Sequence, residues 1–216
     1  MADVREFDEL DRRIVELMCR SSQGSYRQIA KQLGVHPTTL IQRVKNLEAK
    51  GVINGYRAKV DYMRLGFDYM GIIQVYVEKN MLDVQETIRS IPQVLAVFDV
   101  TGECDSIVWI ACRDREEFSN IVKSILKIEG VQKTNTSVIL NVMKDPSDFI
   151  PQVLAVFDVT GECDSIVWIA CRDREEFSNI VKSILKIDGV QKTNTSVILN
   201  VMKDPADFIP QVLDEQ

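Results

Sequence analysis

One 60-residue segment occurs twice in this chain and limits how the chain can fold. Residues 91–150 recur at 150–209, offset by 59 positions, with two differences, Glu129/Asp188 and Ser147/Ala206. The string IPQVL begins both copies and also follows the second. Such near-identity is not a repeat architecture. It indicates a recent duplication by unequal recombination, or an error in assembling the sequence. One unit fewer would leave 157 residues.

The apolar pattern of the first copy, together with the residues before it, predicts one complete domain. Strands are expected over 70–77, 94–101, 106–112 and 134–143, with helices that begin at Asp83 and Asp114. The resulting order βαββαβ is that of a ferredoxin-like domain, whose helices cover one face of an antiparallel sheet. The other face must also be buried, and face-to-face dimerisation is the natural solution.

The second copy predicts only strand, strand, helix and strand, because the first strand and helix lie outside the repeat. We expect it to compete for strand 70–77, to dock on another chain, or to stay loosely ordered. Reaching that strand across 59 residues costs on the order of 3–4 kcal/mol, so the first copy should keep it. Open strand edges then predict more association than a 157-residue form would show.

The N-terminal residues predict three short helices. The first begins at Asp8 or Glu9. Ser25 caps the second, which Gly34 ends, and Pro37 starts the third, which ends before Gly51. The apolar residues expected to face inward are Leu10, Ile14, Leu17, Met18, Ile29, Ala30, Leu33, Leu40, Val44 and Leu47.

Positive charge is concentrated around these helices. From Arg20 to Val60 there are eight Lys and Arg against one acidic residue, Glu48, a net charge of +7. From Asp61 onward the net charge is −10, and that of the whole chain is −6. Local rather than net charge governs affinity for a polyanion, so this basic segment favours a nucleic-acid partner.

The outward stripe of the third helix carries hydrogen-bonding and basic side chains, namely Thr39, Gln42, Arg43, Asn46 and Lys50. Arg, Gln and Asn can make bidentate contacts to base edges, whereas hydroxyls and Lys favour phosphates. A solvated helix face would look similar, but the helix-turn-helix pattern and the basic segment favour binding to double-stranded DNA. Beyond it, Asn54-Gly55 predicts a tight hairpin, a wing whose second strand would hold Arg57 and Lys59 near the DNA backbone.

The segment IAKQLGVHPTTLIQRVKNLEAKGVINGYRAKVDYMRLGF resembles the DNA-binding half of the Lrp/AsnC, or feast/famine, family of transcription regulators. The resemblance implies that the third helix reads the major groove, and that Thr38, Thr39, Gln42, Arg43 and Asn46 contact DNA. It also implies a RAM- or ACT-like C-terminal domain that dimerises through its sheets and builds octamers or other rings of dimers.

Two polar segments of the C-terminal domain are candidate binding sites, the loop Gly102-Glu103-Cys104-Asp105 and the stretch 134–137. A hairpin turn and the strand preference of Thr would explain both without a ligand. The resemblance instead implies that an amino-acid effector binds between dimers. The residues that would contact it are Gly102, Asp105, Thr134, Thr136 and Ser137, with Gly161, Asp164, Thr193 and Thr195 in the second copy.

Together these patterns predict an α+β protein. A winged helix-turn-helix domain spans 1–52, a wing and linker 53–68, a ferredoxin-like domain 69–145, and a partial duplicate with a tail 146–216. We expect a sequence-specific, oligomeric transcription regulator that responds to an amino acid or related metabolite. The alternative is an effector-sensing interaction module or a DNA-compacting architectural protein without a specific operator.

The same sequence argues against other classes. Five cysteines and the single His36 have no zinc spacing, so we expect no metal and no cofactor. No nucleophile with a base and no phosphate-binding glycine loop is present, so no enzyme is expected. Without a signal core or a run of about 20 apolar residues, the chain is expected to be cytoplasmic.

Overall fold

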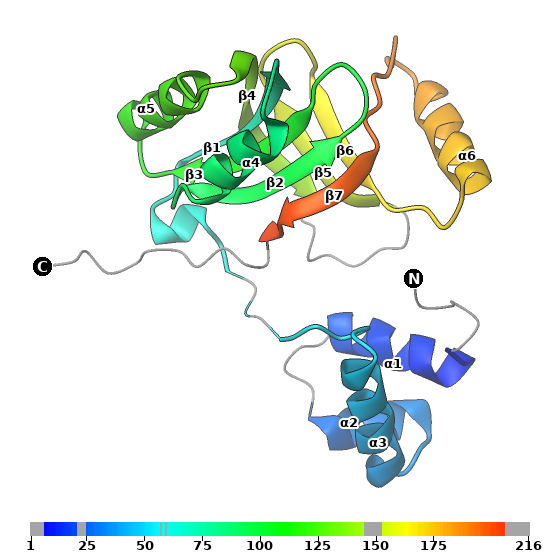
Figure 1. The fold of residues 1–216 in the computed structure, drawn as a ribbon. Helices are drawn as coiled ribbons and strands as arrows, with labels where there is room; N and C mark the ends of the chain where they lie inside the picture. Colours follow the sequence, from blue (N-terminus) through cyan, green and yellow to red (C-terminus); the bar gives the residue numbers. More distant parts are fainter. Residues whose placement is uncertain (1–6, 21–24, 57, 59, 145–152, 206–216) are drawn as a thin grey trace, which may run out of the picture. The chain divides into compact units, whose positions relative to one another are not determined.

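The computed structural model describes residues 7–20, 25–56, 58, 60–144 and 153–205. They form two compact bodies (Figure 1), a helical one within Met1–Lys59 and a sheet-containing one made of Val60–Lys144 and the chain from Ala155 onward. None of the helices in these ranges has the length and apolar character needed to cross a membrane.

The helical body has the three helices expected from the sequence, α1 (Glu9–Arg20), α2 (Tyr26–Leu33) and α3 (Pro37–Ala49). Ser25 caps α2, because its hydroxyl accepts from the Gln28 N–H at 3.3 Å while the Gln28 side chain accepts from the Ser25 N–H at 2.9 Å. Gly34 ends α2 at φ 68°, a conformation that favours glycine. The fully buried side chains are those expected, Ile14, Ile29, Ala30, Leu40, Val44 and Leu47.

The predicted wing is wrong in the part of it that the structure describes. A hairpin turn at Asn54-Gly55 needs a positive φ at both residues, and Asn54 does not have one. Residues 51–56 instead make turns and irregular chain. The N–H groups of Val52 and Ile53 donate to the Leu47 carbonyl, so this segment caps the end of α3. Arg57 and Lys59 lie outside the described residues.

The first copy and its preceding strand form the expected ferredoxin-like domain (Figure 1). Its elements are β1 (Tyr69–Val77), α4 (Met81–Arg89), β2 (Val94–Val100), β3 (Ser106–Cys112), α5 (Arg115–Leu126) and β4 (Val131–Lys144), preceded by the short 3₁₀ helix η2 (Met63–Leu65). The strands lie in the order β4-β1-β3-β2. Because β1 pairs with β3 and β4, the first copy keeps the central strand, as the cost of loop closure predicted.

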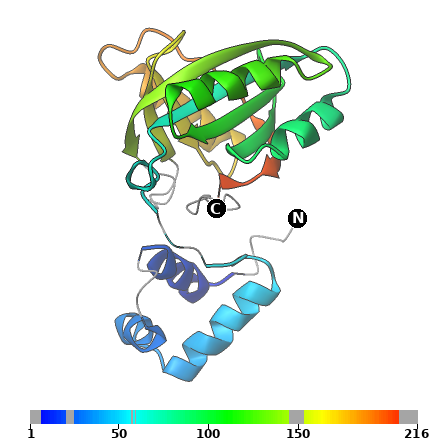
Figure 2. The same ribbon diagram turned by 90° about the vertical axis from the view of Figure 1, so that its left-hand side faces the viewer.

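Helices α4 and α5 cover one face of this sheet (Figure 2). Val84 and Ile88 of α4 and Phe118 and Ile125 of α5 pack against inward side chains of β1, β2 and β3. Helix α4 begins two residues before the expected Asp83, because Asn80 at φ 58° starts it.

The second copy contributes β5 (Val153–Val159), β6 (Ser165–Ile169), α6 (Arg174–Leu185) and β7 (Ile198–Lys203). None of the three placements expected from the sequence describes what it does. It packs on the first copy of its own chain, with β5 beside β4 and β7 beside β2, in a seven-stranded order β6-β5-β4-β1-β3-β2-β7. Its strands β5 and β6 lie behind β1–β4 in Figure 1.

The sheet face opposite α4 and α5 is covered by this second copy. One apolar cluster contains Phe98 and Trp109 of the first copy together with Ala155, Phe157 and Trp168 of the second. The face that the sequence predicted to be buried by a dimer is therefore buried within one chain.

Identical sequences take different structures in the two copies. Strand β4 has 14 residues, and its N-terminal half pairs with β1, whereas its counterpart β7 has only six and residues 190–197 form no strand. Helices α5 and α6 share the sequence REEFSNIVKSIL and an Asp cap, but among the described residues α6 buries none of its side chains. The missing strand and helix explain both differences, since they would supply the partners.

The two helices predict a difference in stability. Phe118→Ala should lower the free energy of unfolding by about 3 kcal/mol, because a buried aromatic side chain leaves a cavity. Phe177→Ala, the same change at the same place in α6, should cost less than about 1 kcal/mol. Urea unfolding followed by circular dichroism measures both. Equal losses would contradict the different packing of the two helices.

Candidate DNA-binding surface and effector site

The start of α3 is held by the residue that precedes it. His36 has extended backbone and acts as the N-cap, its Nδ1 accepting from the Thr38 N–H at 3.4 Å and lying 2.8 Å from the Thr38 hydroxyl. Pro37 occupies the first turn, where its missing N–H has no cost. This arrangement leaves Thr38 and Thr39 at the exposed N-terminal end of α3.

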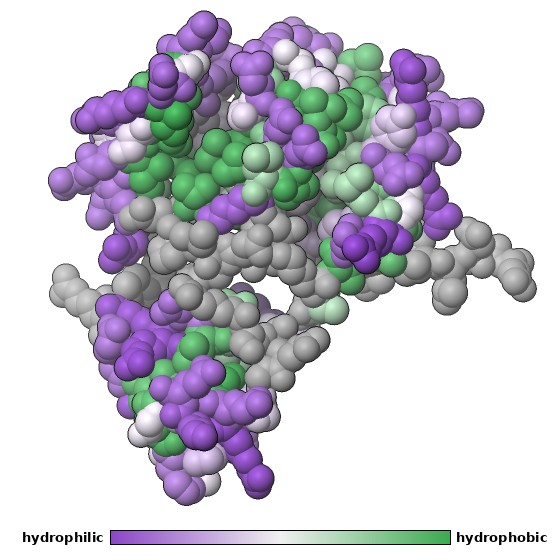
Figure 3. Space-filling view, turned by 180° about the vertical axis from the view of Figure 1, so that it is seen from behind, coloured by the Kyte–Doolittle hydropathy of each residue, from purple (hydrophilic) through white to green (hydrophobic). Residues whose placement is uncertain are grey.

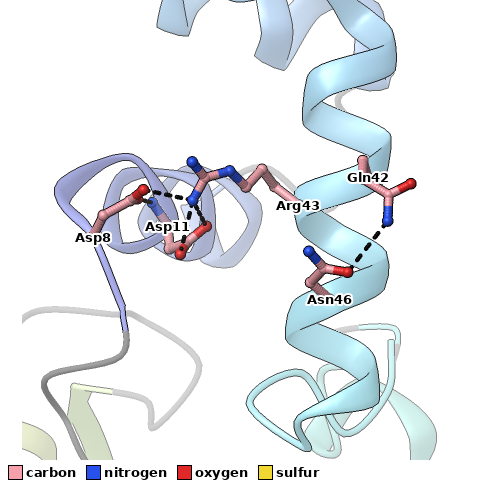
Figure 4. A network of polar contacts seen from close by, with 5 residues as sticks. All are labelled: Asp8, Asp11, Gln42, Arg43 and Asn46. Carbon is pink, nitrogen blue, oxygen red and sulfur yellow. Dashed lines mark hydrogen bonds and ion pairs between the residues drawn. The ribbon is translucent and has the colours of Figure 1, made fainter.

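One exposed face of α3 presents side-chain amides. Gln42 and Asn46 are both exposed, and the Gln42 Nε2 donates to the Asn46 Oδ1 at 3.2 Å (Figure 4). Residues four apart lie one above the other on a helix, so the two amides form a single surface. These side chains can donate to and accept from a base edge at the same time.

Arg43 points away from this surface (Figure 4). Its guanidinium contacts the carboxylates of Asp8 at 2.5 Å and Asp11 at 3.1 Å, both at the start of α1. Asp11 is only 8% exposed, so Arg43 supplies the charge that a buried carboxylate needs. Arg43 thus joins α3 to α1.

Asp8 serves two partners in the same network. Its carboxylate accepts from the Asp11 N–H at 2.9 Å, which caps α1, and from Arg43. The Asp11 N–H first, and then the Arg43 guanidinium, lower the pKa of the Asp8 carboxyl. The sequence analysis did not single out Asp8 or Asp11, although acidic residues in the first turn of a helix are a recognisable signal.

Lys50, the last residue of the predicted stripe, lies at the end of α3. Its Nζ atom is 5.3 Å from the centre of the Phe7 ring, a cation–π distance. Lys50 is exposed, so its charge also faces solvent. Arg57 and Lys59 lie outside the described residues, and the structure gives them no position.

The predicted effector segments of the two copies meet across the units. A Cβ atom on Gly102 would lie 3.0 Å from the Ser196 hydroxyl, and one on Gly161 would lie 3.1 Å from the Ser137 hydroxyl. The carbonyls of Thr195 and Thr136 are the next atoms at these two places. Each glycine loop thus approaches the Thr-Ser segment of the other copy.

The carboxylates of the two loops have different surroundings. Asp105 Oδ2 accepts from the Val77 N–H of β1 at 2.8 Å, so it caps the end of the central strand. The second copy has no such strand, and Asp164 is exposed. Likewise, Thr134 and Thr136 are half-buried in β4, whereas Thr193 and Thr195 are exposed and outside any strand.

Two threonines that the sequence analysis missed complete these junctions. The Thr101 hydroxyl accepts from the Val197 N–H at 3.2 Å, and the Thr160 hydroxyl accepts from the Val138 N–H at 3.1 Å. No signal in the sequence marks them, because their partners lie in the other unit.

Models of two protein domains match this chain. The AsnC-type helix-turn-helix domain matches residues 7–48, and the Lrp/AsnC ligand binding domain matches residues 70–149 and again 148–207. The chain belongs to the Lrp/AsnC family. The second match to the ligand binding domain covers the second copy, which the family model thus recognises in its own right.

Relatives and solved structures agree with the Lrp/AsnC assignment. An HTH-type transcriptional regulator of Pyrococcus horikoshii is 41% identical over 141 residues, 65% of this chain and 95% of the relative. The structure of AsnC from E. coli is 27% identical with a TM-score of 0.59, covering 62% of this chain and 93% of AsnC. A transcriptional regulator from Neisseria meningitidis, solved in complex with L-Met, is 25% identical with a TM-score of 0.60, covering 64% of this chain and 93% of its own.

The placement of Arg43 predicts that it stabilises the helical body. Arg43→Ala should lower the free energy of unfolding by about 1 kcal/mol, because it leaves the buried Asp11 without its cation. Gln42→Ala, one residue away on the exposed face, should change it by less than about 0.5 kcal/mol. Urea unfolding monitored by helical circular dichroism compares them, and an equal effect of the two changes would argue against this role for Arg43.

Proposed function

We propose that the protein is a DNA-binding transcription regulator in which α3 enters the major groove. The exposed amide surface of Gln42 and Asn46, on the third helix of a helix-turn-helix body, is the observation that carries the proposal. The match to the AsnC-type helix-turn-helix domain and the relatives described as HTH-type transcriptional regulators support it.

The side chains of α3 then divide by chemistry. Gln42 and Asn46 suit the N6 and N7 atoms of adenine, and Thr38, Thr39 and Lys50 suit phosphates. Arg57 and Lys59, which follow α3 in the sequence, add positive charge for the DNA backbone. Arg43, through Asp8 and Asp11, sets the position of α3 rather than reading a base.

Selection of binding sites from a random DNA library at physiological salt tests this function. We expect a preferred sequence. Gln42→Ala or Asn46→Ala should reduce discrimination at one position by about 1–3 kcal/mol. Lys50→Ala should weaken binding evenly across sequences and lower the salt dependence, as loss of a phosphate contact does. Steep salt dependence without any sequence preference would overturn the proposal and favour a compacting protein.

We also infer that an amino acid is the effector, bound where the glycine loop of one unit meets the Thr-Ser segment of the other. Hydroxyls and loop amides suit its carboxylate, and the exposed Asp164 suits its ammonium group. The complex of the Neisseria regulator with L-Met supports this class of ligand.

A panel of amino acids in a thermal-shift assay tests the effector. At 100 times its dissociation constant, a bound amino acid should stabilise the protein by about 2.7 kcal/mol. Asp164→Asn should abolish the shift, whereas Asp188→Asn, an exposed acid of the same unit, should leave it unchanged. If no amino acid raises the melting temperature, the effector proposal is wrong.

We infer that residues 150–209 arose by tandem duplication of residues 91–150. The identity of the two segments at all but two positions, and the second match of the family model at 148–207, support this origin. The dimer expected from the sequence needs a free sheet face, and the second unit bears directly on that requirement.

A further inference from the structure

The contacts between the two units come in pairs related by the 59-residue offset. Asp99 pairs with Asn200 between β2 and β7, and Asn141 pairs with Asp158 between β4 and β5. In both pairs the asparagine amide donates to the aspartate carboxylate, at 3.0 and 3.2 Å. Subtracting 59 from the second-unit number turns one pair into the other.

The remaining contacts obey the same relation. Phe98 meets Trp168 edge to face with ring centres 5.0 Å apart, and Phe157 meets Trp109 in the same way at 5.3 Å. The Thr101 N–H donates to the Val197 carbonyl, and the Thr160 N–H to the Val138 carbonyl, each at 2.9 Å. Together with the threonine hydroxyls and the glycine loops, these contacts form an approximate two-fold arrangement.

Reciprocal contacts between identical sequences define a self-complementary surface. Whatever the first unit does to the second, two first units in separate chains could do to each other. The surface includes Phe98, Phe157 and Trp109, which are 5%, 3% and 7% exposed, so it is a packed interface rather than a loose contact. A chain with one unit would therefore use it to form a symmetric dimer.

We propose that the second unit is a built-in partner, which occupies this self-association surface within its own chain and keeps the 216-residue protein monomeric. The surface needs only β5, β6 and β7 from the second unit, and all three lie in the repeated segment. The strand and helix that the repeat lacks leave the other side of the second unit uncovered. There Val167 is 37% exposed, whereas its counterpart Val108 is fully buried.

The connection between the units favours this arrangement over exchange between chains. Only residues 145–152 separate β4 from β5, its antiparallel neighbour. A short connection gives an effective concentration of about millimolar, which a second chain at micromolar concentration does not match. The greater association expected from the open strand edges is thereby reversed.

The arrangement changes how the protein meets DNA, a consequence that rests on the proposed function. A two-fold dimer carries two helix-turn-helix bodies and reads two half-sites about one helical turn apart. A self-partnered chain carries one such body on an equivalent core. It should bind a single half-site without a palindrome.

Sedimentation velocity at about 10 µM is the primary test, and it does not depend on DNA binding. The full chain should sediment with the mass of one chain, and a variant lacking residues 150–208 with the mass of two. A full chain that sediments as a dimer or a larger species, or a shortened variant that stays monomeric, would overturn the proposal.

Variants in the second unit show whether its docking causes the difference. Phe157→Ala with Trp168→Ala removes two aromatic contacts made by the second unit and leaves Phe98 and Trp109 of the first unit intact. This double variant should expose the surface and double the sedimenting mass. Phe177→Ala, in the same unit but on α6, should remain monomeric. If the double variant also stays monomeric while folded by circular dichroism, the second unit is not what blocks association.

Footprinting on a selected operator separates this inference from the proposed function. The shortened variant should protect two half-sites and the full chain one. Absence of binding by both forms would defeat the proposed function and leave the sedimentation result standing. Equal two-half-site protection by both forms would defeat the built-in partner.

Discussion

Burial of the apolar sheet face opposite α4 and α5 is the constraint on which the C-terminal half of this protein depends. A ferredoxin-like domain covers only one face of its sheet, and the other carries Phe98, Trp109 and their neighbours. Exposed apolar patches of this kind are costly in water. Here strands from a second copy of the same sequence supply the cover, and the aromatic pairs at 5.0 and 5.3 Å mark where they meet.

The repeated segment separates local from long-range control of structure. The same twelve residues make α5 and α6, with the same Asp cap, so capping and helix preference suffice to form the helix. They do not suffice to bury it. Residues 131–137 form a strand against β1, while 190–196 do not, because a strand exists only where a neighbour completes its hydrogen bonds. The rear view of the C-terminal body shows apolar side chains at its surface (Figure 3), and Val197, Leu199 and Val201 of the second unit are about half exposed.

Much of the fold could be predicted because its signals are local. Ser25, Gly34 and Pro37 mark helix ends through their own backbone chemistry, and the apolar periodicity places the helices and strands to within a few residues. The wing was wrong because the Asn54-Gly55 preference is weak against the capping of α3 by Val52 and Ile53. The contacts of Arg43 and the docking of the second unit could not be foreseen, because both join residues far apart in the sequence. A stripe on a helix does not reveal that Asp8 and Asp11 face it, and two equal segments do not reveal that they pair.

The central claim is that β7 docks beside β2 of its own chain, and a disulfide can test it most directly. Asp99 and Asn200 are opposite one another in the two strands, with side chains 3.0 Å apart. Asp99→Cys with Asn200→Cys, in a protein whose exposed Cys19 and Cys163 are changed to Ser, should oxidise to a cross-link within one chain. On a non-reducing denaturing gel it should then run at, or faster than, the position of a single reduced chain. A covalent dimer, or no cross-link at all, would contradict the account.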